Sequence, residues 1–398
     1  MKCNRFILSF VFGLITTANM ADVKVPKLPG SKNLGLKAQL GQKLFFDTNL
    51  SEPAGQACST CHDPFKAFSD ASKTRPTSKG VVPGLIGNRN TPTAMYSAFA
   101  PAFHFDQDAG LFIGGQFLDG RAANLADQAK GPFINPIEMA NPDPAVVVQK
   151  VRNADYASLF DQVYGANALG NIQKAYNRIA DAIAAFERSP VFNRFTSKYD
   201  LYLFGKAKFT AQERRGLTVF EAGDKGNCAA CHPNRPVNGV PPLFTDHSYD
   251  NLGVPKNPAN GFYYLNSSFN PQGAYFVDLG LGGSLDQSAE DGKIKVPTLR
   301  NVAITPPYMH NGYFKTLSGL VNFYSNRDLK RRCSNPMTAE AKALNQQCWP
   351  APEVANNVNH AELGSLNLNT REIDDLVAFL NTLTDGYSKE SPWKQTAP

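Results

Sequence analysis

The sequence has little that would direct it to nucleic acid or hold it in a membrane. Its 398 residues include 40 basic and 34 acidic side chains, and the formal net charge is +6. A balance this close to neutral excludes the basic footprint of a nucleic-acid-binding protein and gives only a weak preference for an acidic partner. Beyond the N-terminus no apolar run is long enough to cross a bilayer, so we expect a mature chain without a membrane span.

The one long apolar run lies at the N-terminus. Two basic residues precede an apolar stretch at 6–15, and small and polar residues follow it. This order is typical of a secretory signal, which we place at residues 1–21 with cleavage between Ala18 and Ala21. An uncleaved membrane anchor is the alternative. Export through such a signal predicts a periplasmic protein.

Strand signals are also sparse, and 28 prolines with 31 glycines indicate long loops between helices. Residues 171–189 have apolar side chains at helical spacing, and Pro190 ends that helix. Asn369 and Glu372 have the spacing of a capping box before a second amphipathic helix. The segment 234–293 is expected to be loop with at most a short hairpin. We predict a mainly α fold. The predicted buried faces are Ile172, Tyr176, Ile179, Ile183 and Phe186 in the first helix, and Ile373, Leu376, Val377, Leu380 and Leu383 in the second.

Seven cysteines are present, and six remain once Cys3 leaves with the signal. Four of them belong to two Cys-x-x-Cys-His motifs. We expect the other two, Cys333 and Cys348, to form a disulfide in an oxidising compartment. A redox switch is the alternative for this pair.

The two motifs indicate covalent haem. They are Cys58-Ser-Thr-Cys61-His62 and Cys228-Ala-Ala-Cys231-His232. In such a motif the two thiols add to the vinyl groups of haem, and the histidine that follows coordinates the iron. Zinc would require a second Cys or His pair at short spacing, and none is present. The sequence therefore predicts two c-type haems.

The surroundings of the motifs repeat once. A helical stretch with a Leu-Phe pair precedes the first motif, and a similar stretch with a Val-Phe pair precedes the second. Two similar modules are the natural inference. We place the boundary at Pro190, which gives an N-terminal domain at 22–190 and a C-terminal domain at 191–398.

No evident sixth ligand follows the first motif. No histidine lies between Asp63 and Phe103, and His104 is more simply a hydrogen-bonded surface or core residue. An open iron face would favour chemistry on a small molecule. Farther along, Glu138 lies in an apolar setting with Gln128 ten residues before it. A carboxylate over an open haem moves a proton between the two oxygens of peroxide, although an acid in such a loop is usually a solvated or capping residue.

Several segments of the chain, in order, resemble the bacterial dihaem cytochrome c peroxidases, including their MauG-like branch. They are ACSTCHDP, RNTPT, DGRAANLADQAKGPFINPIEM, CAACH, KVPTLRNVAITPPYMHNG and TLSGLVNFY. The resemblance implies two cytochrome c-like haem domains, the N-terminal one with the open, peroxidatic haem. It also implies that Gln128, Pro132 and Glu138 line the peroxide-binding face. The sequence lacks the histidine that blocks the first haem of standard peroxidases, as MauG-like proteins do.

The second haem separates the branches of this family. Tyr324 falls where the peroxidases have a methionine ligand and the MauG-like proteins a tyrosine. A phenolate is a hard anionic donor that stabilises oxidised iron, whereas methionine raises the potential. The resemblance therefore implies that His232 and Tyr324 coordinate the second haem iron. A buried helix-face tyrosine is the alternative for Tyr324, and Tyr308, Met309 and His310 are rival ligands.

Two further implications concern the region between the haems. Asn90, Thr305 and Pro307 match the family's calcium site, whose backbone and amide oxygens suit that cation. Before DGR the family usually has a tryptophan that relays electrons, but this chain has Leu118. Leucine cannot be oxidised, so transfer between the haems would need direct tunnelling or another aromatic residue such as Phe117.

These observations predict a periplasmic dihaem oxidoreductase that uses hydrogen peroxide. Its electrons would come from a small redox protein, or from aromatic residues of a protein substrate as in a MauG-like maturation enzyme. A conventional cytochrome c peroxidase is the first alternative, and a dihaem electron carrier without catalysis is the second. The chain would act as a monomer or a homodimer.

Overall fold

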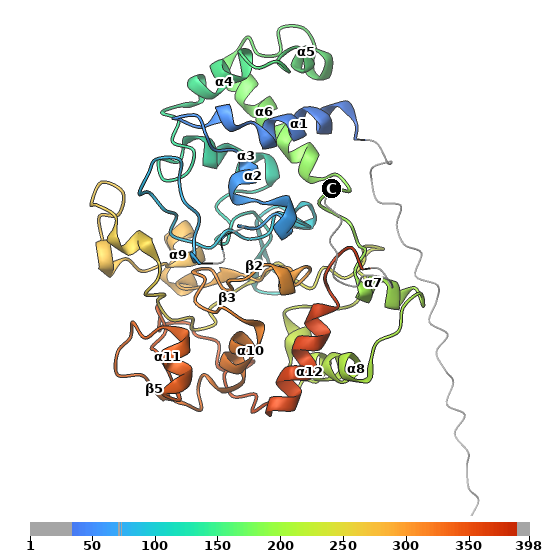
Figure 1. Ribbon diagram of the computed structural model, residues 1–398, viewed down its shortest axis with the longest axis vertical. Coiled ribbons are helices and arrows are strands. Elements are labelled where there is room, and N and C mark those ends of the chain that lie inside the picture. Colours follow the sequence, from blue (N-terminus) through green and yellow to red (C-terminus); the bar gives the residue numbers. More distant parts are fainter. Residues whose placement is uncertain (1–33, 71, 73, 388–398) are drawn as a thin grey trace, which may run out of the picture.

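Helices and long loops account for most of the chain in the computed structural model. It describes residues 34–387 except 71 and 73, so the predicted signal at 1–21 lies outside the described residues. The mainly α prediction is confirmed (Figure 1). The α-helices are α1 (Leu36–Phe46), α2 (Cys58–Cys61), α3 (Leu125–Ile134), α4 (Pro144–Arg152), α5 (Ser158–Tyr164), α6 (Ile172–Glu187), α7 (Lys198–Leu203), α8 (Ala211–Glu221), α9 (Gly280–Leu285), α10 (Leu317–Asn326), α11 (Glu340–Asn345) and α12 (Thr370–Asn381).

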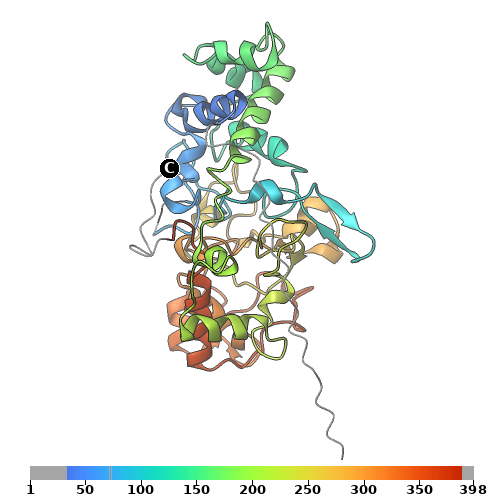
Figure 2. The same ribbon diagram turned by 90° about the vertical axis from the view of Figure 1, so that its right-hand side faces the viewer.

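The strands are short and form three two-stranded sheets. They are β1 (His104–Asp106) with β2 (Leu111–Ile113), β3 (Tyr249–Asp250) with β4 (Ile294–Lys295), and β5 (Arg331–Arg332) with β6 (Cys348–Trp349). The first pair is a hairpin that projects from the side of the molecule (Figure 2). Eight 3-10 helices of three or four residues, among them η4 (Cys228–Ala230), interrupt the loops of the described chain. The segment 234–293, predicted as loop, also contains α9, which the sequence analysis did not anticipate.

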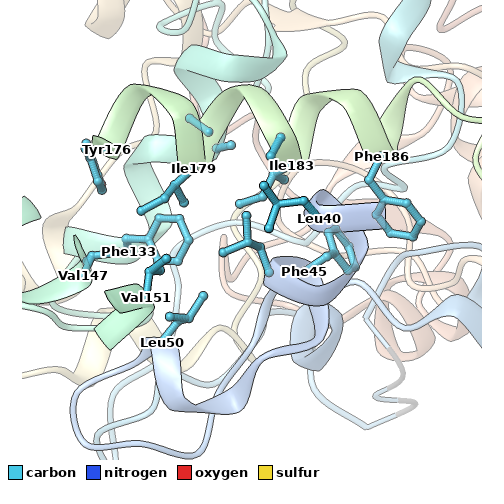
Figure 3. Close-up of a cluster of buried hydrophobic side chains, with 14 of the residues drawn as sticks. Leu40, Phe45, Leu50, Phe133, Val147, Val151, Tyr176, Ile179, Ile183 and Phe186 are labelled. Atoms are coloured by element: carbon cyan, nitrogen blue, oxygen red, sulfur yellow. The ribbon is translucent and has the colours of Figure 1, made fainter. Parts of the chain in front are cut away.

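One hydrophobic core lies in the N-terminal half, within residues 40–192. Helix α6 is its centre, and α1, α3 and α4 pack against it (Figure 3). Tyr176, Ile179, Ile183 and Phe186 are buried as predicted, because they lie on one face of α6. Ile172 was assigned to the same face, and that prediction is wrong. It is the first residue of α6 and is 43% exposed.

A second core lies within residues 199–383, where α8 packs against α12. Asn369 caps α12 with Glu372 in a capping box, as predicted. Leu376, Leu380 and Leu383 are buried, while Ile373 and Val377 are half-buried at the edge of the core. The sequence analysis missed Phe379, which is fully buried.

The same kind of close contact between two helices occurs in both cores. Gly41 of α1 lies against the backbone of Ala182 in α6, and Gly216 of α8 lies against the backbone of Asp375 in α12. A Cβ atom at either glycine would overlap a carbonyl oxygen of the facing helix. Glycine at these crossings lets the helix before each Cys-x-x-Cys-His motif approach the long helix of its own core.

Buried polar groups join the two cores. Asp385 accepts hydrogen bonds from Tyr96 Oη at 2.6 Å and from Asn301 Nδ2 at 2.8 Å. The Arg300 guanidinium forms a two-pronged ion pair with Asp200 and lies 4.9 Å from the Tyr96 ring centroid. Because these side chains come from both halves of the sequence, they fix how the halves lie against each other.

The carboxylate of Glu187, at the end of α6, leads to a prediction about stability. Glu187 is 6% exposed, and burial raises its pKa to about 8. The folded protein therefore holds a proton between about pH 4.5 and 8 that the unfolded chain releases, so the free energy of unfolding falls as pH rises through this window. In the wild-type protein we expect this fall in the free energy of unfolding to be on the order of a few kcal/mol, and we expect it to be absent in Glu187→Gln. Urea unfolding at pH 5 and pH 9 would measure this, and an equal fall in both proteins would contradict it.

The predicted disulfide between Cys333 and Cys348 is present, with a sequence separation of 15. It ties β5 to β6, and Trp349 beside it is fully buried. A cross-link that closes a loop of this length stabilises the folded state by about 3 kcal/mol. We expect the double variant Cys333→Ala/Cys348→Ala to lose about that much in urea unfolding. A loss below about 1 kcal/mol would mean that the loop is ordered without the bond.

Candidate active site

The two Cys-x-x-Cys-His motifs have the same local geometry. The first forms the one-turn helix α2, and the second forms η4. In both, the backbone N–H of the histidine donates to the backbone carbonyl oxygen of the first cysteine at 2.9 Å. The turn sets the two thiols and the histidine side by side, as covalent attachment of one planar group requires.

Each histidine ring is held by a backbone carbonyl. Nδ1 of His62 lies 2.8 Å from the carbonyl oxygen of Phe68, and Nδ1 of His232 lies 2.7 Å from that of Phe244. Burial lowers the pKa of both imidazoles. A neutral ring that donates through Nδ1 has its lone pair on Nε2, which is the form that coordinates a metal.

The sequence analysis missed these two carbonyls. Phe68 and Phe244 both have a φ of 55°, a left-handed conformation that is costly for phenylalanine. This conformation turns each carbonyl toward its histidine while each ring stays in a hydrophobic core. A signal was available, because Phe-Ser-Asp at 68–70 and Phe-Thr-Asp at 244–246 follow the two motifs.

None of the four motif cysteines takes part in a disulfide, whereas Cys333 and Cys348 are bonded to each other. Burial raises the pKa of Cys58, Cys228 and Cys231 to about 12 and that of Cys61 to about 11. Within the described residues, no group of three or more His, Cys, Asp or Glu side chains is placed to hold a metal ion. The donor set fits haem: two neutral thiols for thioether bonds and one neutral imidazole for iron.

A cavity of about 310 Å³ opens beside the second motif. Cys228, Cys231 and His232 line it, and many leucine and valine side chains contribute to its other walls. Tyr324 of α10 and Met309 line it too, with Tyr324 Oη 3.9 Å from Met309 Sδ. Burial, followed by the nearby Cys228 and Cys231 thiols, raises the pKa of Tyr324, so the phenol is neutral without a metal. Tyr324 and Met309 can therefore both reach the same point of this cavity.

The other two rival ligands line the same cavity. Tyr308 pairs through its backbone with Phe314, and burial raises the pKa of its phenol. His310 is 9% exposed, and its Nε2 lies 3.6 Å from a carboxylate oxygen of Glu353. The backbone N–H of Asn90 donates to the carbonyl oxygen of His310 at 2.6 Å. His310 therefore lies where the two halves meet.

Glu138 lies within electrostatic range of the first motif. Gln128 and Pro132 are four residues apart on α3, and Glu138 lies in the turn that follows. The backbone carbonyl of Glu138 accepts from Val81 N–H at 2.8 Å, which fixes this turn. Burial raises the pKa of the Glu138 carboxyl, and Arg121 offsets part of that effect. Its charge in turn contributes to the raised pKa values of Cys58 and Cys61, so the carboxylate lies near both thiols.

His104 was predicted to be a hydrogen-bonded residue of either the surface or the core, and the surface alternative is confirmed. It belongs to the projecting hairpin, is exposed, and places Nδ1 2.8 Å from the carbonyl oxygen of Ala102.

Leu118 and Phe117 lie between the two halves, and both line the cavity. Leu118 is 9% exposed, and its carbonyl accepts from Lys295 N–H at 2.9 Å. The Arg121 guanidinium lies 3.6 Å from the Phe117 ring centroid. A cation over the ring opposes removal of an electron from it, so Phe117 is a poor substitute for an oxidisable relay. Trp349 is buried in the second core, and Trp393 lies outside the described residues.

The three residues matched to a calcium site line one wall of the same cavity. They are Asn90, Thr305 and Pro307. Nδ2 of Asn90 donates to the carbonyl oxygen of Pro76 at 2.9 Å, so Oδ1 points the other way. An amide oxygen and backbone carbonyls are ligands that calcium accepts.

Comparisons with known proteins identify the family of this chain. A profile of the di-haem cytochrome c peroxidase family matches residues 36–208. The methylamine utilization protein MauG of Paracoccus denitrificans is 42% identical over 361 residues, covering 87% of this chain and 88% of the relative. The cytochrome c551 peroxidase of Pseudomonas aeruginosa is 31% identical over 311 residues, covering 78% and 77%.

Solved structures agree as well. The diheme peroxidase BthA from Burkholderia thailandensis superposes with a TM-score of 0.72 at 31% identity, covering 93% of this chain and 92% of that one. No helix among the described residues is long and apolar enough to span a membrane. The chain belongs to the di-haem cytochrome c peroxidase family, in its MauG-like branch, and is a dihaem oxidoreductase that acts on peroxide.

Proposed function

We propose that the N-terminal half, residues 22–190, binds and cleaves hydrogen peroxide, and that the C-terminal half, residues 191–398, passes electrons to it. Cys58, Cys61 and His62 would hold the first haem c, and Cys228, Cys231 and His232 the second. Haem bound at these motifs supplies iron that accepts and releases electrons. The remaining steps fall to the side chains of the chain.

The observation that carries this proposal is the placement of Glu138. Glu138 lies in the turn after α3, its charge acts on the Cys58 and Cys61 thiols, and burial raises the pKa of its carboxyl. Such a group accepts a proton from one peroxide oxygen and returns it to the other, which makes that oxygen leave as water. Gln128, one helical turn before Pro132, would orient peroxide by hydrogen bonding. Pro132 would keep that face of α3 apolar.

Tyr324 is the proposed sixth ligand of the second haem. It lies in the cavity with the second motif, and an anionic oxygen donor would favour the oxidised metal. The charge of bound iron would remove the phenol proton that burial otherwise retains. This ligand favours MauG-like oxidation of aromatic residues in a partner protein. The Paracoccus relative is named a methylamine utilization protein. The buried Leu118, at the place of the family's relay tryptophan, would slow charge sharing between the haems; the conventional peroxidase, with a small redox protein as donor, is the alternative.

Calcium would bind at Asn90, Thr305 and Pro307 and fix the geometry between the halves. The disulfide between Cys333 and Cys348, together with the predicted signal, supports a periplasmic location. Removal of calcium with EGTA should slow the exchange of electrons between the haems and leave haem content unchanged. Identical kinetics with and without calcium would remove the ion from the proposal.

Low-temperature EPR of the ferric protein, before and after stoichiometric hydrogen peroxide, tests the proposed function. We expect one high-spin and one low-spin signal, both lost on peroxide addition without a reductant. Two low-spin signals that do not respond to peroxide would overturn the open first site. The protein would then need prior reduction or carry electrons only.

A further inference from the structure

Three consecutive large apolar side chains lie on the surface at the end of α7. Tyr202, Leu203 and Phe204 are 36%, 37% and 37% exposed. Consecutive exposed apolar residues are unusual on a soluble protein and mark a contact surface. We call these residues, with the exposed Lys206 and Lys208, the α7 patch. Helix α7 lies at the margin of the molecule in Figure 1.

The α7 patch is positively charged. Lys206 Nζ lies 5.8 Å from the Phe204 ring centroid, and Arg214 of α8 is exposed and donates to the carbonyl oxygen of Phe209. Within residues 34–387, Lys206, Lys208 and Arg214 form no ion pair. The two nearest acids are already neutralised: Glu213 by Lys198 at 2.6 Å, and Asp200 by Arg300 at 2.8 Å. A surface of this kind attracts a partner with an acidic face.

An unbroken series of aromatic contacts leads inward from the patch. Tyr202 stacks on Phe209 with centroids 4.1 Å apart and planes at 10°. Tyr199, one turn back on α7, lies 6.4 Å from Tyr202 and 6.1 Å from Phe209. The Tyr199 ring meets Phe244 edge to face at 5.0 Å. Phe244 is the residue whose carbonyl oxygen holds the ring of His232.

The tyrosines are held in a fixed geometry. Tyr199 is 3% exposed and donates from Oη to the carbonyl oxygen of Asn234 at 2.9 Å. Asp200, between the two tyrosines, caps α7 through Ser197 and pairs with the buried Arg300. A short helix alone would fray, but this buried ion pair anchors it. The aromatic contacts are therefore a permanent feature of the fold.

We propose that the α7 patch is the docking surface for an acidic redox protein, and that Tyr202, Tyr199 and Phe244 carry its electrons to the second haem at His232. The inference rests on the proposed role of that haem. One peroxide, two protons and two electrons give two waters, and the two electrons leave the partner one at a time. Tyr199 donates to a carbonyl, which cannot take its proton, so it serves as a tunnelling contact. Tyr202 reaches solvent, where its proton can leave.

Because Tyr202 is the exposed end of this route, we expect it to be oxidised when peroxide is present without an electron donor. Two copies of Tyr202 would each lose one electron and one proton and join through a new carbon–carbon bond, while one peroxide becomes two waters. Tyr264 and Tyr275 are matched controls, because they are 71% and 88% exposed and lie outside the route. Oxidation that followed exposure alone would modify both of them before Tyr202.

Peptide mapping by mass spectrometry of the haem-loaded protein, after peroxide without donor, is the first test. We expect modification of Tyr202 to exceed that of Tyr264 and Tyr275 by about fivefold or more, and Tyr199→Leu to reduce it. Modification in the order of exposure would overturn the route, and the wild-type protein alone decides this if Tyr199→Leu does not fold. If the wild-type protein consumes no peroxide, the proposed function fails first, which separates the two failures.

The second test addresses docking, with reduced plastocyanin as an acidic donor. We expect Lys206→Glu/Lys208→Glu to lower kcat/KM about tenfold at low salt, with the difference lost at high salt. Arg331→Glu/Lys342→Glu is the control, since β5 and α11 lie across the C-terminal half from α7 (Figure 1). Equal effects of the two charge reversals, or no effect of the first, would overturn the docking surface.

Discussion

Replacement of Glu138 by glutamine is expected to slow the reaction with hydrogen peroxide by about 10²- to 10⁴-fold while both haems remain attached. Glutamine keeps the shape of the side chain and its place in the turn after α3, but it cannot accept a proton. The loss therefore reports proton transfer and leaves the haem motifs untouched. Stopped-flow absorbance after mixing with peroxide gives the rate constant, and the haem absorbance per polypeptide gives the content.

The pH dependence of this reaction has a defined sign. Burial raises the pKa of the Glu138 carboxyl above 4.5. The carboxylate accepts a proton only when ionised, so the rate should fall as pH drops through that raised pKa. In Glu138→Gln this fall should disappear along with most of the rate.

Glu187 provides a matched control. It is a second buried carboxyl group near Cys58, and because burial raises its pKa to about 8, the comparison is made above pH 8, where Glu187→Gln removes a charge as Glu138→Gln does. The rate of the Glu187→Gln variant should stay within about twofold of wild type, because general acid–base catalysis requires the group to reach the proton in transfer. Equal losses in the two variants would indicate a general charge effect at the first motif, and wild-type rates in Glu138→Gln would remove Glu138 from the mechanism.

Tyr324→Phe is expected to change the absorption and EPR spectra of the second haem completely while those of the first stay the same. The substitution removes only the oxygen that is proposed to bind iron, and the ring still fills its place on α10. Loss of a hard anionic donor should also raise the reduction potential of the second haem. Spectroelectrochemistry of the ferric and ferrous forms measures both effects.

Met309→Leu decides between the two candidate ligands. Met309 Sδ lies 3.9 Å from Tyr324 Oη, so either side chain could supply the ligand atom in this cavity. We expect Met309→Leu to leave the second haem six-coordinate. A changed spectrum in Met309→Leu with an unchanged one in Tyr324→Phe would assign the ligand to methionine and favour the conventional peroxidase.

Much of the outline could be predicted from local sequence. The periodicity of α6 and the capping box of α12 depend on residues close in sequence. The disulfide could be predicted because Cys333 and Cys348 are the two cysteines left outside the haem motifs and the predicted signal. Where the prediction failed, a distant element decided the outcome. Ile172 has the right spacing but is exposed at the first position of α6, and Phe379 is buried because α8 and the loop at Phe244 close over it.

The sequence by itself determined the chemistry of attachment: two cysteines and a histidine, twice, with no second ligand pair for zinc. It also carried the family resemblance and named Glu138, Gln128 and Tyr324 as candidates. Only the tertiary structure brought Tyr324 and Met309 to one point of a cavity, turned the Phe68 and Phe244 carbonyls onto the histidines, and brought Tyr199 into ring contact with both Tyr202 and Phe244. The physical reason is how far apart along the chain the interacting residues lie. A motif is fixed by immediate neighbours along the chain, whereas these contacts join residues up to 45 positions apart and depend on loop conformation and on how whole helices pack.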